Sequence, residues 1–344
     1  MSNTTHSASI TQTRFDRFLA YRLQNEAMAV TVVPALGGKI VSVTTGLRQR
    51  EWLWRNNRIC HRKAVPADCY TRLHDTGGVD ECFPSVDACE LPSDAGVFAG
   101  LTLPDHGELY GRPWTQVRCT EHADGSVSLI LKQKCSTLPV TFQRSLTLPP
   151  DQGCIKFQYS VRNLCDTAVP FSWCLHPALA ITPGMELVLP NNHQLHCSFA
   201  SEHAPLVTGD TFYWPNTPGG SNLSVIPEVA PENGFAAKLL SVNDLFDCTN
   251  PGAKARIGIM DPATGEALYF DLAPEEVPHL ALWLNYGGWA GDGGTPYFNL
   301  VLEPAIGNAD SLRELIDRNT APILAPGSSR QWSFQICTDN APLC

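Results

Sequence analysis

Two ionisable side chains follow apolar, strand-like segments and directly precede a proline. His176 comes after the apolar segment 169–175, and Glu303 closes the segment 299–303. A carboxylate at the end of an apolar strand is costly to bury unless it is paired or functional. A histidine and a glutamate whose surroundings separate their pKa values can act as an acid/base pair near neutral pH. The two residues are therefore candidates for proton-transfer chemistry, although their sequence spacing does not show that they meet.

Each candidate also has a structural interpretation. His176 could be a core histidine that hydrogen-bonds a backbone carbonyl, and Glu303 could form an ion pair with an Arg or Lys elsewhere in the chain. His106, in the turn-like sequence Asp-His-Gly-Glu, could simply be exposed to solvent. Both interpretations stay open at this point.

Other catalytic motifs are missing from the sequence. It contains neither a G-x-S-x-G nucleophile nor a G-x-x-x-x-G-K-[ST] phosphate loop. His193, His196 and Cys197 are residue types that bind zinc, but no fourth ligand lies near them, so we expect no metal. The 13 cysteines are odd in number and include no C-x-x-C pair. We expect mostly free thiols, with Cys154 and Cys337 packed in apolar runs.

The segments that must position these residues are predicted to be strands. Short runs rich in β-branched and aromatic residues alternate with turns drawn from 27 prolines and 26 glycines, which is typical of a β-sandwich or barrel. The clearest predicted strands are 127–132, 154–161, 267–272, 299–303 and 331–337. One helix is predicted at 311–318, where Ser311 and Glu314 have the spacing of a capping box.

Strand alternation divides the segment 299–303 into two faces. Asn299, Val301 and Glu303 share one face, and Leu300 and Leu302 share the other. The sequence therefore predicts that Glu303 lies on the face opposite to the two leucines.

Composition and charge exclude several classes of protein. With 344 residues, of which 43% are hydrophobic, the chain can bury a large core. The net charge is −10 and there is no basic run, so we expect no nucleic-acid partner. The apolar stretches are too short to cross a bilayer, so we expect no membrane partner. Residues 1–13 are predicted to be a flexible leader and 14–344 a single β-sandwich domain, in a cytoplasmic monomer or homodimer.

Four segments together resemble the aldose 1-epimerase or galactose mutarotase-like superfamily. They are GGVDECFPS (77–85), PDHGELYGRPW (104–114), SWCLHPA (172–178) and LVLEPAIGNADSL (300–312). The resemblance extends from 33–40 to 326–332, and the first two segments look closest to bacterial branches near the hexose-6-phosphate epimerases. It implies a single large β-sandwich with a sugar cleft, and a cofactor-free enzyme that interconverts α and β anomers of a carbohydrate substrate.

The resemblance also implies roles for individual residues. His176 matches the general acid that protonates the ring oxygen, and Glu303 matches the general base that deprotonates the anomeric hydroxyl. His106 matches a histidine that binds substrate. Weaker matches suggest further substrate contacts from Arg72, Asp80, Glu81 and Asp247, and a stacking surface from Trp283 and Trp289.

One departure from the pattern bears on the substrate. Glu108 follows His-Gly directly, and Arg112 comes six residues after His106, where the sugar-phosphate epimerases carry an earlier arginine. A carboxylate beside a phosphate would repel it, so we favour an unphosphorylated sugar. Two other functions remain open: a non-catalytic carbohydrate-binding or regulatory protein, and an acid/base isomerase or cyclase of a non-sugar metabolite.

Overall fold

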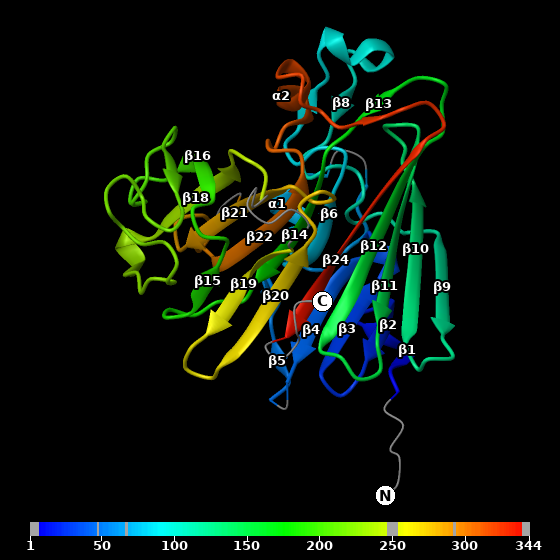
Figure 1. Cartoon of the computed structure of the whole chain (residues 1–344), viewed down its shortest axis with the longest axis horizontal. Helices are drawn as coiled ribbons and strands as arrows, with labels where there is room; N and C mark the ends of the chain where they lie inside the picture. The colour runs from blue at the N-terminus through cyan, green and yellow to red at the C-terminus, as the bar shows by residue number, and fades with distance from the viewer. Residues whose placement is uncertain (1–6, 47, 66–67, 246–253, 292–293, 339–344) are drawn as a thin grey trace, which may run out of the picture.

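Antiparallel strands are the main regular element of the computed structural model, which describes residues 7–46, 48–65, 68–245, 254–291 and 294–338. Two large sheets lie against each other, so the prediction of an all-β sandwich is confirmed (Figure 1). The larger sheet has 12 strands: β1 (Ser9–Phe15), β2 (Phe18–Gln24), β3 (Met28–Val33), β4 (Lys39–Thr45), β6 (Gly78–Cys82), β14 (Trp173–Leu179), β22 (Phe298–Ile306), β21 (His279–Tyr286), β18 (Phe235–Ser241), β16 (Gln194–Ala200) and β17 (Thr211–Tyr213) in spatial order, with β5 (Arg50–Glu51) paired to β4.

The second sheet has eight strands. In spatial order they are β15 (Glu186–Val188), β19 (Ala255–Asp261), β20 (Glu266–Leu272), β24 (Ser329–Thr338), β12 (Cys154–Asn163), β11 (Val140–Leu148), β10 (Val127–Lys134) and β9 (Gln116–Glu121). Two small sheets pair β7 (Cys89–Glu90) with β8 (Thr102–Leu103), and β13 (Val169–Pro170) with β23 (Ile323–Leu324). All five strands singled out from sequence are present, because each carries alternating apolar residues that one buried sheet face requires.

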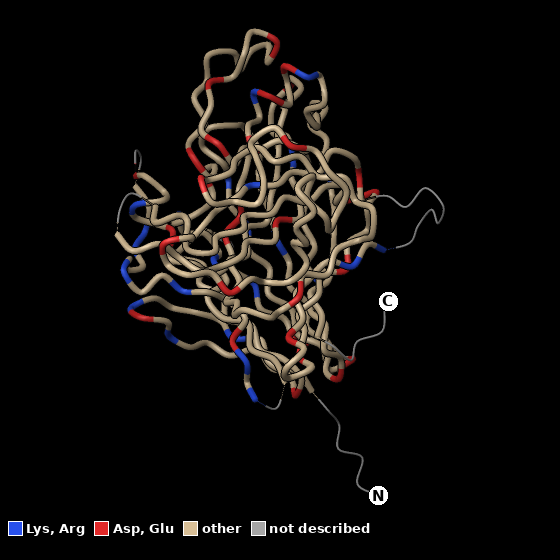
Figure 2. The backbone as a smooth tube through the Cα atoms, turned by 90° about the vertical axis from the view of Figure 1, so that its left-hand side faces the viewer, with Lys and Arg blue, Asp and Glu red and all other residues tan. Residues whose placement is uncertain are grey.

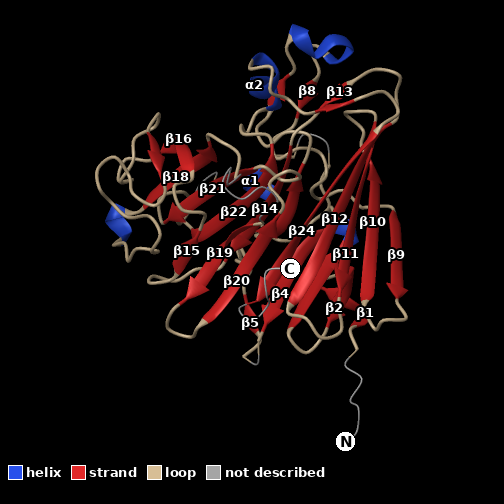
Figure 3. Ribbon diagram, in the orientation of Figure 1, coloured by secondary structure: helices blue, strands red, loops and turns tan. Residues whose placement is uncertain are grey.

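Helical segments are few and short (Figure 3). They are α1 (Tyr70–Leu73), α2 (Leu312–Asp317) and the 3-10 turns η1 (Pro34–Leu36), η2 (Ser93–Phe98) and η3 (Pro231–Asn233). Helix α2 confirms the predicted helix, and Ser311 occupies its N-cap position. The Ser311 side chain makes no capping hydrogen bond, so the expected capping box is not formed.

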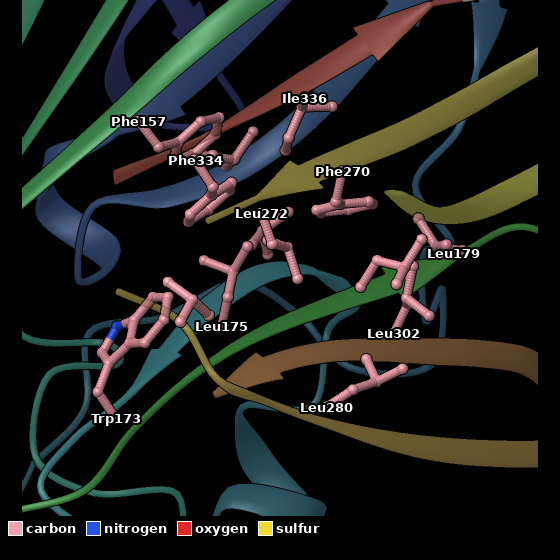
Figure 4. Close-up of a cluster of buried hydrophobic side chains, with 14 of the residues drawn as sticks. Phe157, Trp173, Leu175, Leu179, Phe270, Leu272, Leu280, Leu302, Phe334 and Ile336 are labelled. Carbon is pink, nitrogen blue, oxygen red and sulfur yellow. The ribbon is translucent and has the colours of Figure 1, made fainter. Parts of the chain in front are cut away.

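The core lies between the two sheets. Figure 4 shows apolar side chains from both sheets in contact, among them Trp173 and Leu175 of β14 and Phe334 of β24. Phe157 and Phe334 are cross-strand partners whose rings stack at 4.9 Å. Because one continuous cluster is built from both sheets, burial of apolar area holds them together and fixes the orientation of β14.

The start of the chain differs from its prediction. Ser9–Phe15 is not part of a flexible leader but forms β1, which pairs along its whole length with β2. Ile10 packs against the main core and Phe15 against a smaller cluster near Phe18, so the segment gains apolar contacts that its polar composition conceals. Residues 1–6 lie outside the described residues.

The cysteines follow the prediction with one exception. Nine described cysteines are free thiols, as expected. Cys154 and Cys337, which we expected to be packed thiols, face each other on β12 and β24 and are joined by a disulfide. Cys248 and Cys344 lie outside the described residues.

Acidic and basic residues are interspersed along the backbone (Figure 2). Across the described ranges, none of the helices is long and apolar enough to cross a membrane.

Candidate functional site

A pocket of about 440 Å³ opens on the face of the larger sheet that points away from the core. Its floor comes from residues of the neighbouring strands β14, β22, β21, β18 and β16. Its rim comes from α1, the turn around His106 and the segment that leads into α2. Its lining includes Tyr70, Asp75, Asp87, Asp105, His106, His176, Phe199, Lys238, Trp283, Trp289, Asn299, Val301, Glu303, Asp310 and Glu314.

The predicted alternation of β22 is confirmed. Asn299, Val301 and Glu303 line the pocket, whereas Leu300 and Leu302 are fully buried in the core. The two leucines hold the strand against the second sheet, and the same strand therefore presents Glu303 to the pocket.

His176 and Glu303 lie opposite each other on neighbouring strands. Strands β14 and β22 pair through Trp173↔Ile306 and Cys174↔Ala305, and again through Ala178↔Val301. The register on both sides is the same, and continuing it across the gap places His176 opposite Glu303. Directly opposite residues have Cβ atoms about 4.5–5.5 Å apart. The sheet thus brings together two residues separated by 127 positions in the sequence.

Neither residue ends its strand, contrary to the prediction. Strand β14 continues to Leu179 and β22 to Ile306, although proline follows both His176 and Glu303. Pro177 and Pro304 have no amide hydrogen to donate. Both prolines lie in the stretch where the β14–β22 ladder is interrupted, so the strands pass through them without losing pairing to β6 and β21.

The two oxygens of Glu303 differ in their surroundings. Its side chain is fully buried, and Oε2 accepts a hydrogen bond from Lys238 Nζ at 2.6 Å. The Cys174 thiol lies 3.4 Å from the same oxygen. Oε1 makes no hydrogen bond with any described residue. Both the ion pair considered from sequence and a free acceptor atom are therefore present in one carboxylate.

Lys238 also contacts a second carboxylate, Asp310, at 3.3 Å. Burial alone would lower the pKa of Lys238, but the charges of Asp310 and Glu303 outweigh it and raise the pKa. Lys238 is therefore a permanent cation at the pocket floor.

The two histidines have opposite electrostatic surroundings. Burial would lower the pKa of His106, but the hydrogen bond and charge of Asp105, whose Oδ1 lies 3.0 Å from Nδ1, raise it overall. Burial, and then the positive charge of His106, hold the pKa of His176 well below its usual range. Their ring centroids are 5.1 Å apart. His106 is therefore the more readily protonated member of the pair, and His176 favours its neutral form.

The ring of His106 is held in place from behind. It stacks on Tyr70 with centroids 3.7 Å apart, and the Tyr70 hydroxyl donates to Asp80 at 2.9 Å. Asp80 is in turn paired with Lys39 at 2.5 Å. Asp80 itself is buried and does not line the pocket, so its contact with the site passes through Tyr70.

Three aromatic side chains form one wall of the pocket. They are Phe199, Trp283 and Trp289. Lys238 on β18 lies between the first two, because it is the cross-strand partner of both Phe199 on β16 and Trp283 on β21. Trp289 stands perpendicular to Trp283, with ring centroids 5.8 Å apart. The stacking surface suggested by Trp283 and Trp289 is thus part of the pocket, and Phe199 extends it.

Arg72 does not line the pocket, although Tyr70 of the same helix does. Successive helical residues are rotated by about 100°, so a residue two positions on points to roughly the opposite side. Arg72 is accordingly exposed to solvent. Asp247 lies outside the described residues.

Glu81 points to the other side of β6, into the sandwich core. It contacts Arg144 at 2.8 Å and accepts a hydrogen bond from Trp173 Nε1 at 2.7 Å. Asp80 and Glu81 are neighbours in a strand, so they must face opposite sides and cannot both reach the cleft. Glu81 belongs to a buried ion pair rather than to the pocket lining.

The residues that bear on phosphate are also placed elsewhere. Glu108 is buried and accepts amide hydrogens from Ser136, Thr137 and Leu138, and Arg112 lies beside it. Neither residue lines the pocket. The repulsion that we expected from Glu108 therefore does not act there, and any discrimination against phosphate must come from other carboxylates.

His193, considered from the sequence as a zinc ligand, lies beside a hydroxyl group. Its Nε2 lies 2.8 Å from Ser241 Oγ. Within the ranges that the structure describes, no three His, Cys, Asp or Glu side chains are grouped as a metal site would require.

Lys238 and Asp310 were missed from the sequence. Lys238 is the only charged residue in the apolar strand FAAKLLS, which is the same signal that singled out Glu303. Asp310 lies within a segment quoted for the resemblance, but nothing in its local sequence distinguishes it. Phe199 carries no signal at all, because its role depends on the order of strands in the sheet.

Comparison with known proteins supports the fold. No family model matches the sequence, and no curated protein matches it. Among solved structures, a protein of Synechocystis sp. PCC 6803 is similar at 21% identity and TM-score 0.65, over 98% of this chain and 99% of that one. A galactose mutarotase-like protein of Clostridium acetobutylicum is similar at 15% identity and TM-score 0.65, over 97% and 99%.

A further similar structure is a galactose mutarotase-like protein of Lactobacillus casei, at 16% identity and TM-score 0.58, over 96% of this chain and all of the other. At these identities the likeness concerns the fold. The chain has the galactose mutarotase-like β-sandwich fold, which confirms the fold implied by the sequence resemblance.

Proposed function

We propose that the protein is a cofactor-independent aldose 1-epimerase that interconverts the α and β anomers of a sugar. The observation that carries the proposal is the buried carboxylate of Glu303, which lines the pocket and lies opposite His176, and one of whose oxygens has no hydrogen-bond partner among the described residues. A protein that only binds a sugar has no need of a buried acceptor beside two histidines whose pKa values are shifted in opposite directions.

The proposed reaction begins with ring opening. Glu303 Oε1 takes the proton from the anomeric hydroxyl, the C1–O5 bond breaks, and O5 takes a proton from the His106–His176 pair. The open aldehyde then rotates about the C1–C2 bond. Closure reverses both proton transfers on the other face of the carbonyl, so the enzyme ends in its starting protonation state.

The two histidines divide the acid role in this proposal. The resemblance assigns His176 to the ring oxygen, whereas His106 is the histidine whose pKa is raised and which holds a proton more readily. We propose that the pair acts as one donor that holds a single proton. A neutral imidazole alone is too weak an acid to protonate O5.

We further propose that the substrate is a free aldose rather than a sugar phosphate. Of the charged residues lining the pocket, six are carboxylates (Asp75, Asp87, Asp105, Glu303, Asp310 and Glu314), and Lys238 is already paired with two of them. Burial raises the pKa of Asp75 to about 6. Burial and then the charge of Asp310 raise the pKa of Asp87. With six carboxylates and one lysine in its lining, the pocket has an excess of acidic groups, which would repel a phosphate.

The proposal extends to partners and location. The partner is a small carbohydrate, the chain acts as a monomer or homodimer, and the location is cytoplasmic, where most of its thiols would stay reduced.

The test is polarimetry on paired substrates: free aldoses, the matching 6-phosphates and uronic acids, with Glu303→Gln as the blank. We expect the enzyme to accelerate the anomerisation of at least one free aldose and not to accelerate that of its 6-phosphate. Sugar binding by calorimetry without any acceleration would instead indicate a carbohydrate-binding protein.

The aromatic wall gives a separate prediction about binding. Trp289→Ala should raise KM roughly tenfold, or about 1.4 kcal/mol, and change kcat much less, because stacking holds the sugar equally in ground and transition states. Tyr213→Ala is a matched control, since Tyr213 is an exposed aromatic outside the pocket. Steady-state kinetics of both variants would show whether the wall binds substrate; equal KM values would contradict it.

A further inference from the structure

We propose that Lys238 is a positioning residue that keeps Glu303 ionised and reserves Oε1 for proton transfer, with Asp310 opposing it. This inference rests on the proposed function, because it assigns the proton acceptor of that reaction a partner.

The first step of the argument is the need for a counter-charge. A buried carboxylate without a partner is protonated rather than charged, and a protonated Glu303 cannot act as a base. Lys238 is the one cation in contact with it among the described residues, at 2.6 Å. Lys238 is 9% exposed, so water screens the pair little.

The second step concerns the two carboxylate oxygens of Glu303, which have different contacts. Lys238 and the Cys174 thiol both contact Oε2, whereas Oε1 has no partner in the described residues. A carboxylate anchored through one oxygen cannot rotate freely, so the other oxygen has a fixed direction. The anchor comes from β18, two strands away from β22 in the sheet, with β21 between them.

The third step is the role of Asp310. It contacts the same ammonium at 3.3 Å and thereby competes with Glu303 for it. Burial and the charge of Glu303 raise the pKa of Asp310, although the charge of Lys238 lowers it. Asp310 therefore opposes the effect of Lys238, so substitutions of the two residues should shift the pH dependence of kcat in opposite directions.

Other titratable groups face Glu303 from the surrounding strands and turns. Burial raises the pKa values of the Cys82 and Cys174 thiols, which stay neutral, and His106 adds positive charge. These groups are Cys174 and His176 on β14, Cys82 on β6, His106 in its turn, and Lys238 and Asp310. In the variants below all of them except the substituted residue are unchanged.

The test compares the pH dependence of kcat in the full-length wild type, Lys238→Met and Asp310→Asn. The deprotonated form of Glu303 carries the activity, so the acidic limb reports its loss as the pH falls. Lys238→Met should move that limb to higher pH by about one unit or more, which is about a tenfold loss on the limb, with recovery in more alkaline buffer. Asp310→Asn should move it to lower pH.

Asp310→Asn is a conservative change, because the backbone carbonyl of Asp310 keeps its hydrogen bonds from the amides of Val86 and Asp87. A purely structural role for Lys238 predicts a uniform loss in both variants with no movement of the limb. That result, or movement of the acidic limb in the same direction in both variants, would overturn the inference.

A second measurement does not depend on turnover. Infrared difference spectra between each protein and its Glu303→Gln counterpart report the protonated carboxyl of Glu303 directly as the pH is changed. We expect protonation at higher pH in Lys238→Met and at lower pH in Asp310→Asn; unchanged titration would overturn the inference. If the wild type accelerates no sugar, the proposed function fails, whereas active wild type with unmoved limbs removes only the role of Lys238.

Discussion

Glu303→Gln is expected to lower kcat for anomerisation at least ~10²-fold, because loss of a positioned general base removes about that much rate or more. Glutamine keeps the volume of the side chain, and its amide oxygen can still accept a hydrogen bond from Lys238. It cannot take the proton from the anomeric hydroxyl. The measurement is kcat by polarimetry at several pH values, together with the thermal unfolding temperature.

The matched control for this variant is Glu266→Gln. Glu266 lies on β20 of the second sheet, where it pairs with Arg50 at 3.6 Å, and it is not part of the pocket lining. It should keep wild-type kcat. Near-normal turnover in Glu303→Gln, with the protein folded, would remove the proposed mechanism.

The second large effect is expected at the histidine pair. His176→Asn and His106→Asn should each lower kcat by about 10²-fold, since either change disrupts proton donation to the ring oxygen. Because Asp105 raises the pKa of His106, the donor is charged below that pKa and loses its proton as the pH rises through it. Activity should therefore fall on the alkaline side of the pH profile.

Asp105→Asn separates this role from simple substrate binding. Without the carboxylate the charged form of His106 is less stable, so the alkaline limb should move to lower pH while kcat in acidic buffer is largely kept. If His106 only contacted substrate, the change would alter KM and leave the limb in place. The limb is measured from kcat at saturating sugar, and an unmoved limb would argue against a shared proton.

Much of the fold could be predicted from the sequence, because strand alternation is a local property. The segments 127–132 and 331–337 are strands as expected, and the two-faced pattern of 299–303 correctly separates Glu303 from the leucines of the core. The strand ends were wrong at Pro177 and Pro304. Proline interrupts only one ladder, and a strand within a sheet keeps its other neighbour.

The site was less accessible to sequence reasoning, because its geometry depends on the order of strands. His176 meets Glu303 only since β14 and β22 are neighbours, and Lys238 reaches the same carboxylate from β18. The local pattern does distinguish Asp80 from Glu81. Glu81 follows Asp80 directly in a strand, so alternation alone would have excluded one of them from the cleft.

The central claim is that the pocket opens and closes a sugar ring by proton transfer at O1 and O5 alone. It is tested most directly by magnetisation-exchange NMR of a free aldose in D₂O, which measures α/β interconversion and deuterium at C2 in one sample. We predict faster α/β exchange, lost in Glu303→Gln, with no enzyme-dependent deuterium at C2. Deuterium at C2 would identify an isomerase that acts on a carbon-bound proton, and no acceleration for any aldose would contradict the mutarotase assignment.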